Sequence, residues 1–110
     1  FVSNQWDPSC IFELQVPLRS QDGTELEGKI LRVLPVKIDD PAAMYFDTRT
    51  RLLNIVSDAD NILYEVDLEG RLIRQYAFLA DNQEGLTRDP EGFLYIAQDT
   101  GGIIKVRDLR

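Results

Sequence analysis

Two similar stretches of the chain decide its fold: Asp47-Thr-Arg-Thr-Arg-Leu-Leu-Asn-Ile-Val-Ser-Asp58 and Asp89-Pro-Glu-Gly-Phe-Leu-Tyr-Ile-Ala-Gln-Asp99. Each begins with an aspartate that opens a turn, continues into an apolar run and ends at a second aspartate. The first aspartates lie 42 positions apart (89 − 47), and the spacing falls to 41 because the second copy has one turn residue fewer. A repeat of this length is typical of arrays of small structural units.

The similarity continues outward from both stretches. The segment Ile62-Leu-Tyr-Glu-Val-Asp-Leu68 matches Ile103-Ile-Lys-Val-Arg-Asp-Leu109, and Ile11-Phe-Glu-Leu14 matches Leu63-Tyr-Glu-Val66 as part of an earlier copy. These segments are rich in Ile, Val, Leu, Tyr and Phe, which favours short β-strands. No segment of useful length has apolar residues at the helical period of 3.6, so we expect almost no helix.

The central copy predicts four strands, which we call A to D in chain order: Ala43–Asp47, Leu52–Ser57, Ile62–Asp67 and Leu72–Phe78. The first copy lacks an A strand and predicts B, C and D at Phe1–Ser3, Ile11–Val16 and Ile30–Val36. The last copy begins with an A strand at Gly85–Arg88, followed by B and C, and lacks D. The sequence therefore predicts ten strands.

Four-stranded antiparallel units that repeat about every 40–45 residues are typical of β-propeller blades. We therefore predict an all-β chain of antiparallel four-stranded β-propeller blades. Residues 1–36 form a partial blade, residues 42–78 a complete blade and residues 84–109 a second partial blade. A closed propeller has about four to eight blades, so these roughly two and a half blades are an incomplete propeller.

The turns and the core are also predictable. Asp67-Leu-Glu-Gly70 and Asp89-Pro-Glu-Gly92 are turn sequences in which the final glycine takes a positive φ. The residues expected to form the core lie on the apolar strands: Leu53, Ile55, Val56, Ile62, Tyr64, Leu94 and Ile96.

Composition excludes several functions. The net charge of −7 disfavours nucleic acid as a partner, because binding a polyanion needs a cationic surface. The chain has no His, so it cannot build a Ser-His-Asp or Cys-His relay by itself. Cys10 is the only cysteine, which rules out an internal disulfide and a cysteine–histidine zinc site. A membrane anchor or export signal is expected only upstream of Phe1.

The central and last copies resemble the SdiA-regulated family of bacterial propeller proteins (the YjiK/CarP group). The similarity lies in Leu52-Leu-Asn-Ile-Val-Ser-Asp58, Tyr64-Glu-Val-Asp-Leu-Glu-Gly70, Gln83-Glu-Gly-Leu86 and Asp89-Pro-Glu-Gly-Phe-Leu-Tyr-Ile96. The central A strand departs from the family's usual small-Gly-Leu pattern, since it has Ala42-Ala-Met44 there. The resemblance implies a protein of the periplasm or bacterial cell envelope that is linked to calcium handling and has no established enzymatic activity.

Strand direction predicts a cluster of carboxylates. Strands A and C of a blade run one way and B and D the other, so the B–C and D–A loops lie at the same end. We call this the acidic end, because its loops contain eight carboxylates and no Lys or Arg, with Lys37 at the margin: Asp7, Asp39, Asp40, Asp58, Asp60, Asp81, Glu84 and Asp99. Trp6 lies in one of these loops, where it either packs or stacks on a ligand.

Carboxylates grouped in this way favour a hard cation such as Ca²⁺. The candidate ligands are Glu84, Asp58, Asp99, Asp60 and Asp81. Glu84 is the sharpest candidate because it opens strand A, the innermost strand, from which its carboxylate could reach the central channel. The alternative is that these aspartates are turn residues that accept hydrogen bonds from backbone amides.

These observations lead to a functional hypothesis with two alternatives. The leading hypothesis is a non-enzymatic propeller module of the bacterial envelope that binds a protein partner or a divalent cation and is linked to calcium signalling or homeostasis. The first alternative is part of a Ca²⁺-dependent propeller hydrolase or lactonase, and the second is a structural fragment without a ligand. In each case, the open blade edges are expected to promote self-association or pairing with a protein partner.

Overall fold

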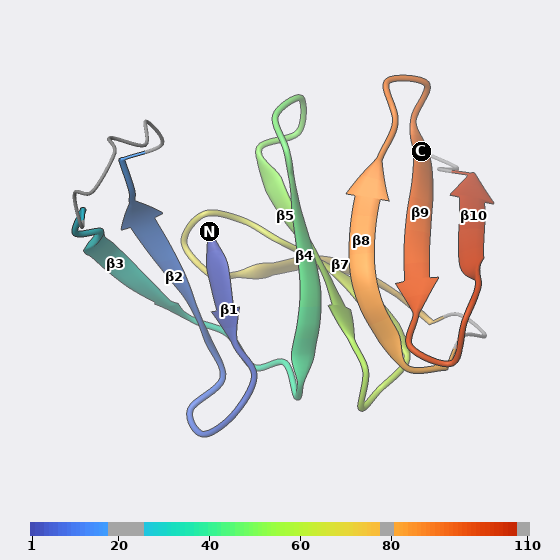
Figure 1. Ribbon diagram of the computed structural model, residues 1–110, viewed down its shortest axis with the longest axis horizontal. Helices are drawn as coiled ribbons and strands as arrows, with labels where there is room; N and C mark the ends of the chain where they lie inside the picture. Colours follow the sequence, from blue (N-terminus) through green and yellow to red (C-terminus); the bar gives the residue numbers. More distant parts are fainter. Residues whose placement is uncertain (18–25, 78–80, 108–110) are drawn as a thin grey trace.

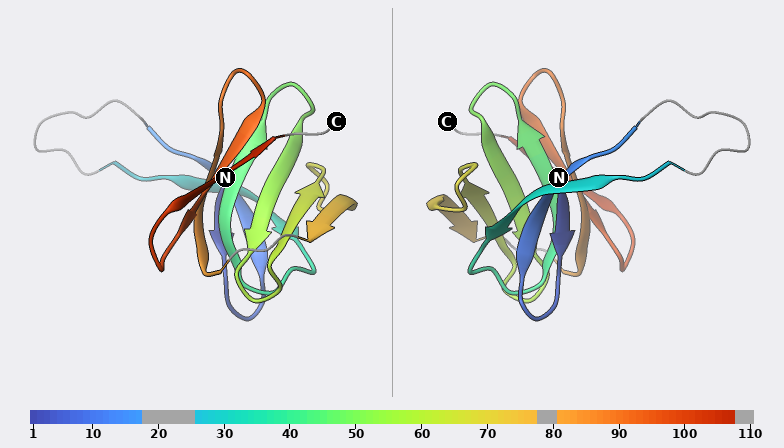
Figure 2. Two further views of the ribbon diagram at one scale, coloured as in Figure 1. Left: turned by 90° about the vertical axis from the view of Figure 1, so that its right-hand side faces the viewer. Right: turned by 90° about the vertical axis from the view of Figure 1, so that its left-hand side faces the viewer.

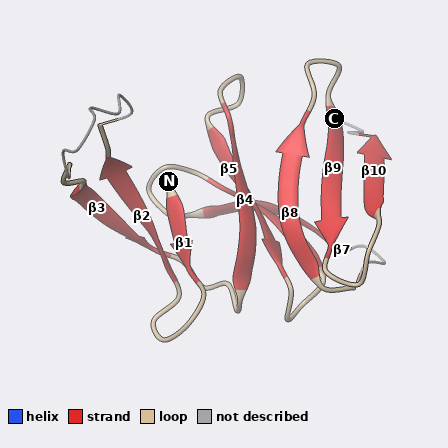
Figure 3. Ribbon diagram, in the orientation of Figure 1, coloured by secondary structure: helices blue, strands red, loops and turns tan. Residues whose placement is uncertain are grey.

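The computed structural model describes residues 1–17, 26–77 and 81–107, and within these ranges the chain is all-β with no helix (Figures 1 and 3). The described part accordingly contains no helix able to cross a membrane. The ten strands are β1 (Val2–Asn4), β2 (Cys10–Gln15), β3 (Lys29–Pro35), β4 (Pro41–Asp47), β5 (Leu52–Ser57), β6 (Ile62–Val66), β7 (Leu72–Ala77), β8 (Gln83–Arg88), β9 (Phe93–Gln98) and β10 (Ile103–Arg107).

The strands form three antiparallel sheets of three, four and three strands, in the orders β1-β2-β3, β4-β5-β6-β7 and β10-β9-β8. Neighbours in a sheet are neighbours in the chain, as in the blades predicted from the repeat. The fold class is therefore confirmed as an incomplete, propeller-like all-β fold whose sheets do not close into a ring. Phe78, the predicted end of β7, lies outside the described residues.

The three sheets lie in chain order along the longest axis of the molecule (Figure 1), and Figure 2 shows them from the two ends of that axis. Strand β4, at the inner edge of the central sheet, contacts β1 of the first sheet and β8 of the third. The central sheet thus has a neighbour on each face. This arrangement explains why β5 is almost continuously buried, whereas a sheet with one solvated face would alternate.

Two apolar clusters fill the spaces between the sheets. The first joins Ile11 and Leu34 of the first sheet to Leu53, Ile55 and other residues of the central sheet. The second joins Val56 and its neighbours to Leu94 of the third sheet. Six of the seven predicted core residues are buried; the exception is Ile62, which is only partly buried. It is the first residue of β6, beside a loop that contains the exposed residues Ala59 and Asp60, and it packs against the first cluster.

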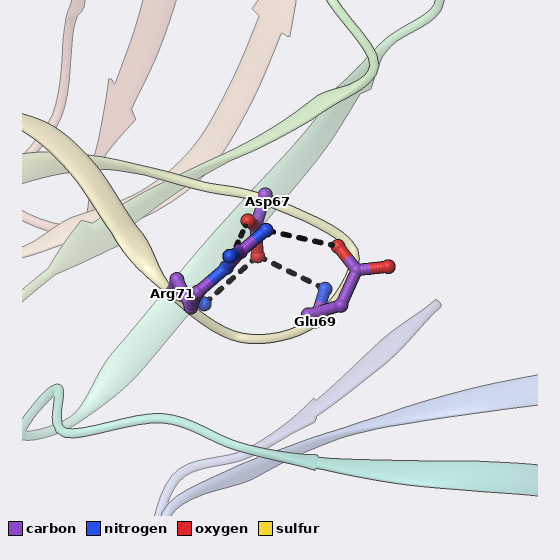
Figure 4. Close-up of polar contacts among 3 residues, drawn as sticks. All are labelled: Asp67, Glu69 and Arg71. Carbon is purple, nitrogen blue, oxygen red and sulfur yellow. Dashed lines mark hydrogen bonds and ion pairs between the residues drawn. The ribbon is translucent and has the colours of Figure 1, made fainter.

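The two predicted glycine turns are present. Gly70 and Gly92 have φ values of +85° and +95°, and their amides donate to the carbonyl oxygens of Asp67 and Asp89 at 3.0 and 3.1 Å. Figure 4 shows the β6–β7 turn, in which one carboxylate oxygen of Asp67 accepts hydrogen bonds from the amides of Glu69 and Arg71 at 3.0 and 2.9 Å. The other oxygen accepts from the Arg71 side chain at 2.7 Å. The opening aspartate thus supports the turn.

A charged pair at one position of the repeat joins strands C and D in two sheets. In the first sheet Arg32 Nε lies 2.5 Å from Glu13 Oε2, and in the central sheet Arg74 Nε lies 2.6 Å from Glu65 Oε2. The glutamates occupy matching positions in the aligned segments that begin at Ile11 and Leu63. The first pair is exposed, whereas the Glu65 side chain is only 2% exposed. Less water screens the charges of Glu65 and Arg74, so the attraction between them is stronger than in the exposed pair.

Candidate binding site at the acidic end

The described residues of the B–C and D–A loops lie at one end of the molecule, along the lower edge in Figure 1. The amide of Asp58 in the β5–β6 loop donates to the carbonyl oxygen of Asp40 in the β3–β4 loop at 3.2 Å. The matching bond in the next repeat runs from the amide of Asp99 to the carbonyl of Asn82 at 2.8 Å. These bonds link the B–C loops of the central and third sheets to the D–A loops that precede those sheets, so the predicted strand polarity is confirmed.

Buried polar side chains reinforce this connection. The Ser57 hydroxyl donates to the carbonyl oxygen of Asp39 at 2.6 Å, and the Gln83 side-chain amide donates to Asn61 Oδ1 at 2.8 Å. Both Ser57 and Gln83 are fully buried. The Gln83 bond joins the third sheet to a loop of the central sheet, so the acidic end is held together across sheets.

The two candidate ligands of the β5–β6 loop differ in their surroundings. Asp60 is exposed, and its Oδ2 accepts a hydrogen bond from the Tyr64 hydroxyl at 3.0 Å. Burial, together with this bond to a carboxylate, raises the pKa of Tyr64. Asp58 is partly buried, and its Oδ1 is shielded from solvent without a hydrogen-bond partner among the described residues. Asp60 is therefore engaged in a structural contact, while Asp58 has an oxygen that makes none.

The remaining candidates, Asp81, Glu84 and Asp99, are all exposed. Glu84 lies in an irregularity of β8, where the pairing with β9 shifts between Gln83 and Gly85. The central sheet has the same shift between Pro41 and Ala43 of β4. Bulges re-aim a side chain at the edge of a sheet, so the direction of the Glu84 carboxylate depends on this local feature as well as on its place at the start of strand A.

The described residues contain no group of three or more Asp, Glu or Cys side chains close enough together to hold a metal ion. The five predicted ligands share one end of the molecule but come from different elements. Asp58 and Asp60 lie in the β5–β6 loop and Asp99 in the β9–β10 loop, whereas Asp81 precedes β8 and Glu84 lies within it. Calcium ligation by these residues therefore stays a prediction.

A groove of about 520 Å³ opens beside the first loop of the acidic end. Its walls come from three loops, and the residues lining it are Gln5, Trp6, Asp7, Pro8, Ser9, Asp39, Asp40 and Ala59. Trp6 is 74% exposed, the highest value among the large hydrophobic residues described. We call this the Trp6 groove. Three of the eight acidic-end carboxylates line it, and none of these three belongs to the predicted metal-ligand set.

Side-chain hydrogen bonds hold the loop that carries Trp6. The Asn4 side-chain amide donates to the carbonyl oxygens of Trp6 at 2.7 Å and Pro8 at 3.0 Å. The Ser9 hydroxyl donates to the carbonyl oxygen of Gln5 at 3.3 Å. The exposed indole therefore projects from a loop whose backbone is already bonded internally.

The model of the SdiA-regulated family matches residues 1–101. The chain belongs to the SdiA-regulated family. The match includes the first sheet as well as the central and last copies that carry the resemblance, and it spans the Trp6 groove and all five predicted metal ligands. No curated protein matches the chain significantly.

In this SdiA-regulated chain, sequence reasoning missed the polar residues that join the acidic-end loops. Ser57 ends the mostly apolar strand β5 and Gln83 opens the largely polar strand β8, and both side chains are fully buried at the acidic end. A polar residue at such a position needs a hydrogen-bond partner, and the nearest partners are loop carbonyls and amides. The grouping of Trp6 with Asp39 and Asp40 was also missed, because it depends on the packing of the first sheet against the second.

Proposed function

We propose that this SdiA-regulated chain is a non-enzymatic propeller module of the bacterial envelope, which binds a protein partner or a divalent cation at its acidic end and participates in calcium signalling or homeostasis. One observation carries the proposal: loops of all three sheets meet at one end and present exposed carboxylates there. Hydrogen bonds between these loops hold them in position without a bound ligand. The family resemblance supports the envelope location and the link to calcium.

Calcium is the divalent cation that suits this end best, because it accepts carboxylate and carbonyl oxygens in flexible geometry. Carboxylates that share a small region repel one another, and a bound divalent ion relieves that repulsion. Since an ion that binds only the folded state stabilises it, Ca²⁺ should raise the melting temperature of the chain. We expect a weak site, with a dissociation constant on the order of millimolar, as in rigid extracellular modules.

Thermal melting followed by circular dichroism tests this part of the proposal. We expect added Ca²⁺ to raise the melting temperature more than the same concentration of Mg²⁺, which controls for ionic strength. The Glu84→Gln variant should lose the Ca²⁺-specific part of the shift, whereas the exposed, opposite-end variant Glu91→Gln should keep it. Equal shifts with both ions would reject a calcium site, and an unchanged shift in Glu84→Gln would remove Glu84 from it.

The open edges of the incomplete propeller are the second proposed contact region. The apolar residues exposed on three of the strands are Ile30, Leu31 and Val33 on β3, Leu72, Ile73 and Tyr76 on β7, and Ile103 on β10. A run of exposed apolar side chains beside unpaired strand edges favours association with another chain. We propose that this region pairs with a second copy or a protein partner, while the acidic end stays open to solvent.

A further inference from the structure

We infer that the Trp6 groove binds an arginine- or lysine-bearing segment of a protein partner. This inference rests on the proposed function and specifies the chemistry of the partner at the acidic end. The structural observation is the juxtaposition of an exposed indole with the carboxylates of Asp7, Asp39 and Asp40 around one groove. Neither feature selects a ligand by itself, whereas together they are complementary to a cationic side chain that also has an apolar stem.

The indole supplies the first half of the recognition. Tryptophan is the aromatic side chain that attracts a cation most strongly over its face, and an arginine guanidinium also stacks on it. An indole that is 74% exposed has a free surface for such a contact. Because the Asn4 and Ser9 side chains already brace the loop, little backbone ordering has to accompany binding.

The carboxylates supply the second half. Asp7 and Asp39 are exposed and Asp40 is partly buried, and none of the described residues lining the groove is Lys or Arg. The chain as a whole carries a net charge of −7, which steers a basic segment toward it. A guanidinium lying on the indole would have carboxylates beside it to accept its N–H groups.

The geometry favours an organic cation over a metal ion in this groove. Calcium needs six to eight oxygens at about 2.3–2.6 Å, and the three carboxylates that line the groove are not gathered closely enough to begin such a shell. A groove of about 520 Å³ has the size of a site for a side chain or small organic group. Charge attraction over a few ångströms and stacking on the ring do not require ligands at bonding distance.

The same chemistry already occurs within the chain. Lys105 Nζ lies 4.1 Å from the centroid of the Phe93 ring and 5.4 Å from that of Tyr95 on the third sheet. A hydrogen bond with the Tyr95 hydroxyl raises the pKa of Lys105, together with the nearby charges of Asp89 and Glu91. In that contact an ammonium is held by aromatic faces with carboxylates close by, which is the combination that the Trp6 groove presents to an external cation.

Trp6 is the only tryptophan in the chain, so its fluorescence reports directly on the groove. The experiment titrates the whole chain with a short oligo-arginine peptide at physiological ionic strength. The matched control peptide has citrulline in place of arginine, which keeps the shape and removes the charge. We expect a saturable change in Trp6 emission with the arginine peptide and none with the citrulline peptide. Binding detected by calorimetry without any change in Trp6 emission would overturn the inference.

Charge-matched variants separate a local site from general attraction. Asp39→Asn with Asp40→Asn removes two groove carboxylates, and Asn tolerates the positive φ of +45° at position 40. Glu69→Gln with Glu91→Gln removes two exposed carboxylates from turns at the opposite end. We expect the first double variant to weaken binding about tenfold or more and the second by less than about twofold, because distant exposed charges are screened.

Trp6→Ala, measured by calorimetry, should weaken binding of the arginine peptide by about three- to tenfold, the loss expected for an exposed cation–π contact and its apolar area. Equal weakening by both double variants, or full affinity in Trp6→Ala, would overturn the inference. The two proposals can fail separately. A Ca²⁺-specific stabilisation without peptide binding would reject only the binding of a basic segment. Peptide binding without a calcium response would reject only the calcium site.

Discussion

At the scale of single residues, Asn54 is the least expected feature of the core. It lies in the middle of β5, is fully buried, and neither atom of its side-chain amide has a hydrogen-bond partner among the described residues. It pairs across the strands with Tyr45 and Glu65, so it belongs to the face that also carries Val56 and faces the third sheet. The sequence showed a polar residue inside an apolar run but gave no sign of whether it would find a partner.

A buried amide without hydrogen bonds costs about 1–3 kcal/mol in proteins. We therefore predict that Asn54→Leu, in which the two side chains have the same number and branching of heavy atoms, leaves the free energy of unfolding unchanged or raises it by roughly 1–2 kcal/mol. Urea denaturation measures the change, and Leu53→Ala on the opposite face is the control, with an expected loss of about 2–5 kcal/mol. A loss above about 1 kcal/mol in Asn54→Leu would mean that the amide makes a stabilising polar contact in solution.

At the scale of strands and turns, the aspartate that opens each hairpin and the glycine that ends it account for the accuracy of the sequence-based predictions. Both are local: the aspartate side chain bonds amides two to four residues ahead, and the glycine needs only a positive φ. The bulges in β4 and β8 and the Glu–Arg pairs between C and D strands were not predicted. They depend on register between strands, which a single sequence leaves open.

Two of these glycines offer a matched comparison. A Cβ at Gly92 would have no atom within 4 Å, so Gly92→Ala meets only the strain of its φ of +95°, about 1–2 kcal/mol. A Cβ at Gly70 would lie 2.7 Å from the carbonyl oxygen of Pro35, in the neighbouring sheet. We predict that Gly70→Ala costs roughly 1–3 kcal/mol more than Gly92→Ala.

Chemical denaturation of the two variants measures the difference directly. Equal losses would show that the β6–β7 turn does not approach the first sheet as closely in solution.

The lowered pKa values of three turn aspartates indicate how the free energy of unfolding depends on pH. The amide of Arg71 is the largest influence that lowers the pKa of Asp67. Burial would raise the pKa of Asp47 and Asp89, but hydrogen bonds from the amides of Arg49 and Phe93, with other contacts, outweigh it and leave both lowered. A carboxyl whose folded pKa lies below its unfolded value adds stability that is complete above the unfolded pKa, here about 3.8.

Stability should therefore fall as the pH drops below about 4, through the lowered folded pKa values. The measurement is the free energy of unfolding in urea between about pH 7 and pH 2. Asp67→Asn should lose part of its stability near neutral pH and show a shallower fall in acid than the unchanged chain. An identical acid profile in Asp67→Asn would contradict the assignment of its carboxylate to the turn.

At the scale of the whole molecule, the sheets end in edges that no described residue covers. Every residue of β7 is exposed, as is each residue of β3 except Leu34. Since a propeller closes only when its first and last blades meet, these surfaces have no partner within the described chain. The repeat spacing and the number of strands predicted this incompleteness, whereas the location of the exposed apolar surface became visible only with the packing of the sheets.

The isolated chain should therefore associate as its concentration rises. Sedimentation velocity over a wide concentration range should show an average mass that increases above the monomer. Replacing Ile30, Val33 and Ile73 by Thr, which keeps the preference for strands, should shift the distribution toward the monomer. A single monomeric species at high concentration in the unchanged chain would contradict association through the open edges.

We propose that the acidic end is the binding end of this SdiA-regulated chain. The most direct test is two-dimensional amide NMR of the isotopically labelled triple-Thr chain during separate titrations with Ca²⁺ and with the oligo-arginine peptide. We expect amide shifts to concentrate in the β1–β2, β3–β4, β5–β6 and β9–β10 loops and near Glu84, with the largest peptide-induced shifts around Trp6 and Asp40. Shifts that concentrate instead in the opposite turns, around Arg49, Glu69 and Glu91, or no shifts with either ligand, would contradict the proposal.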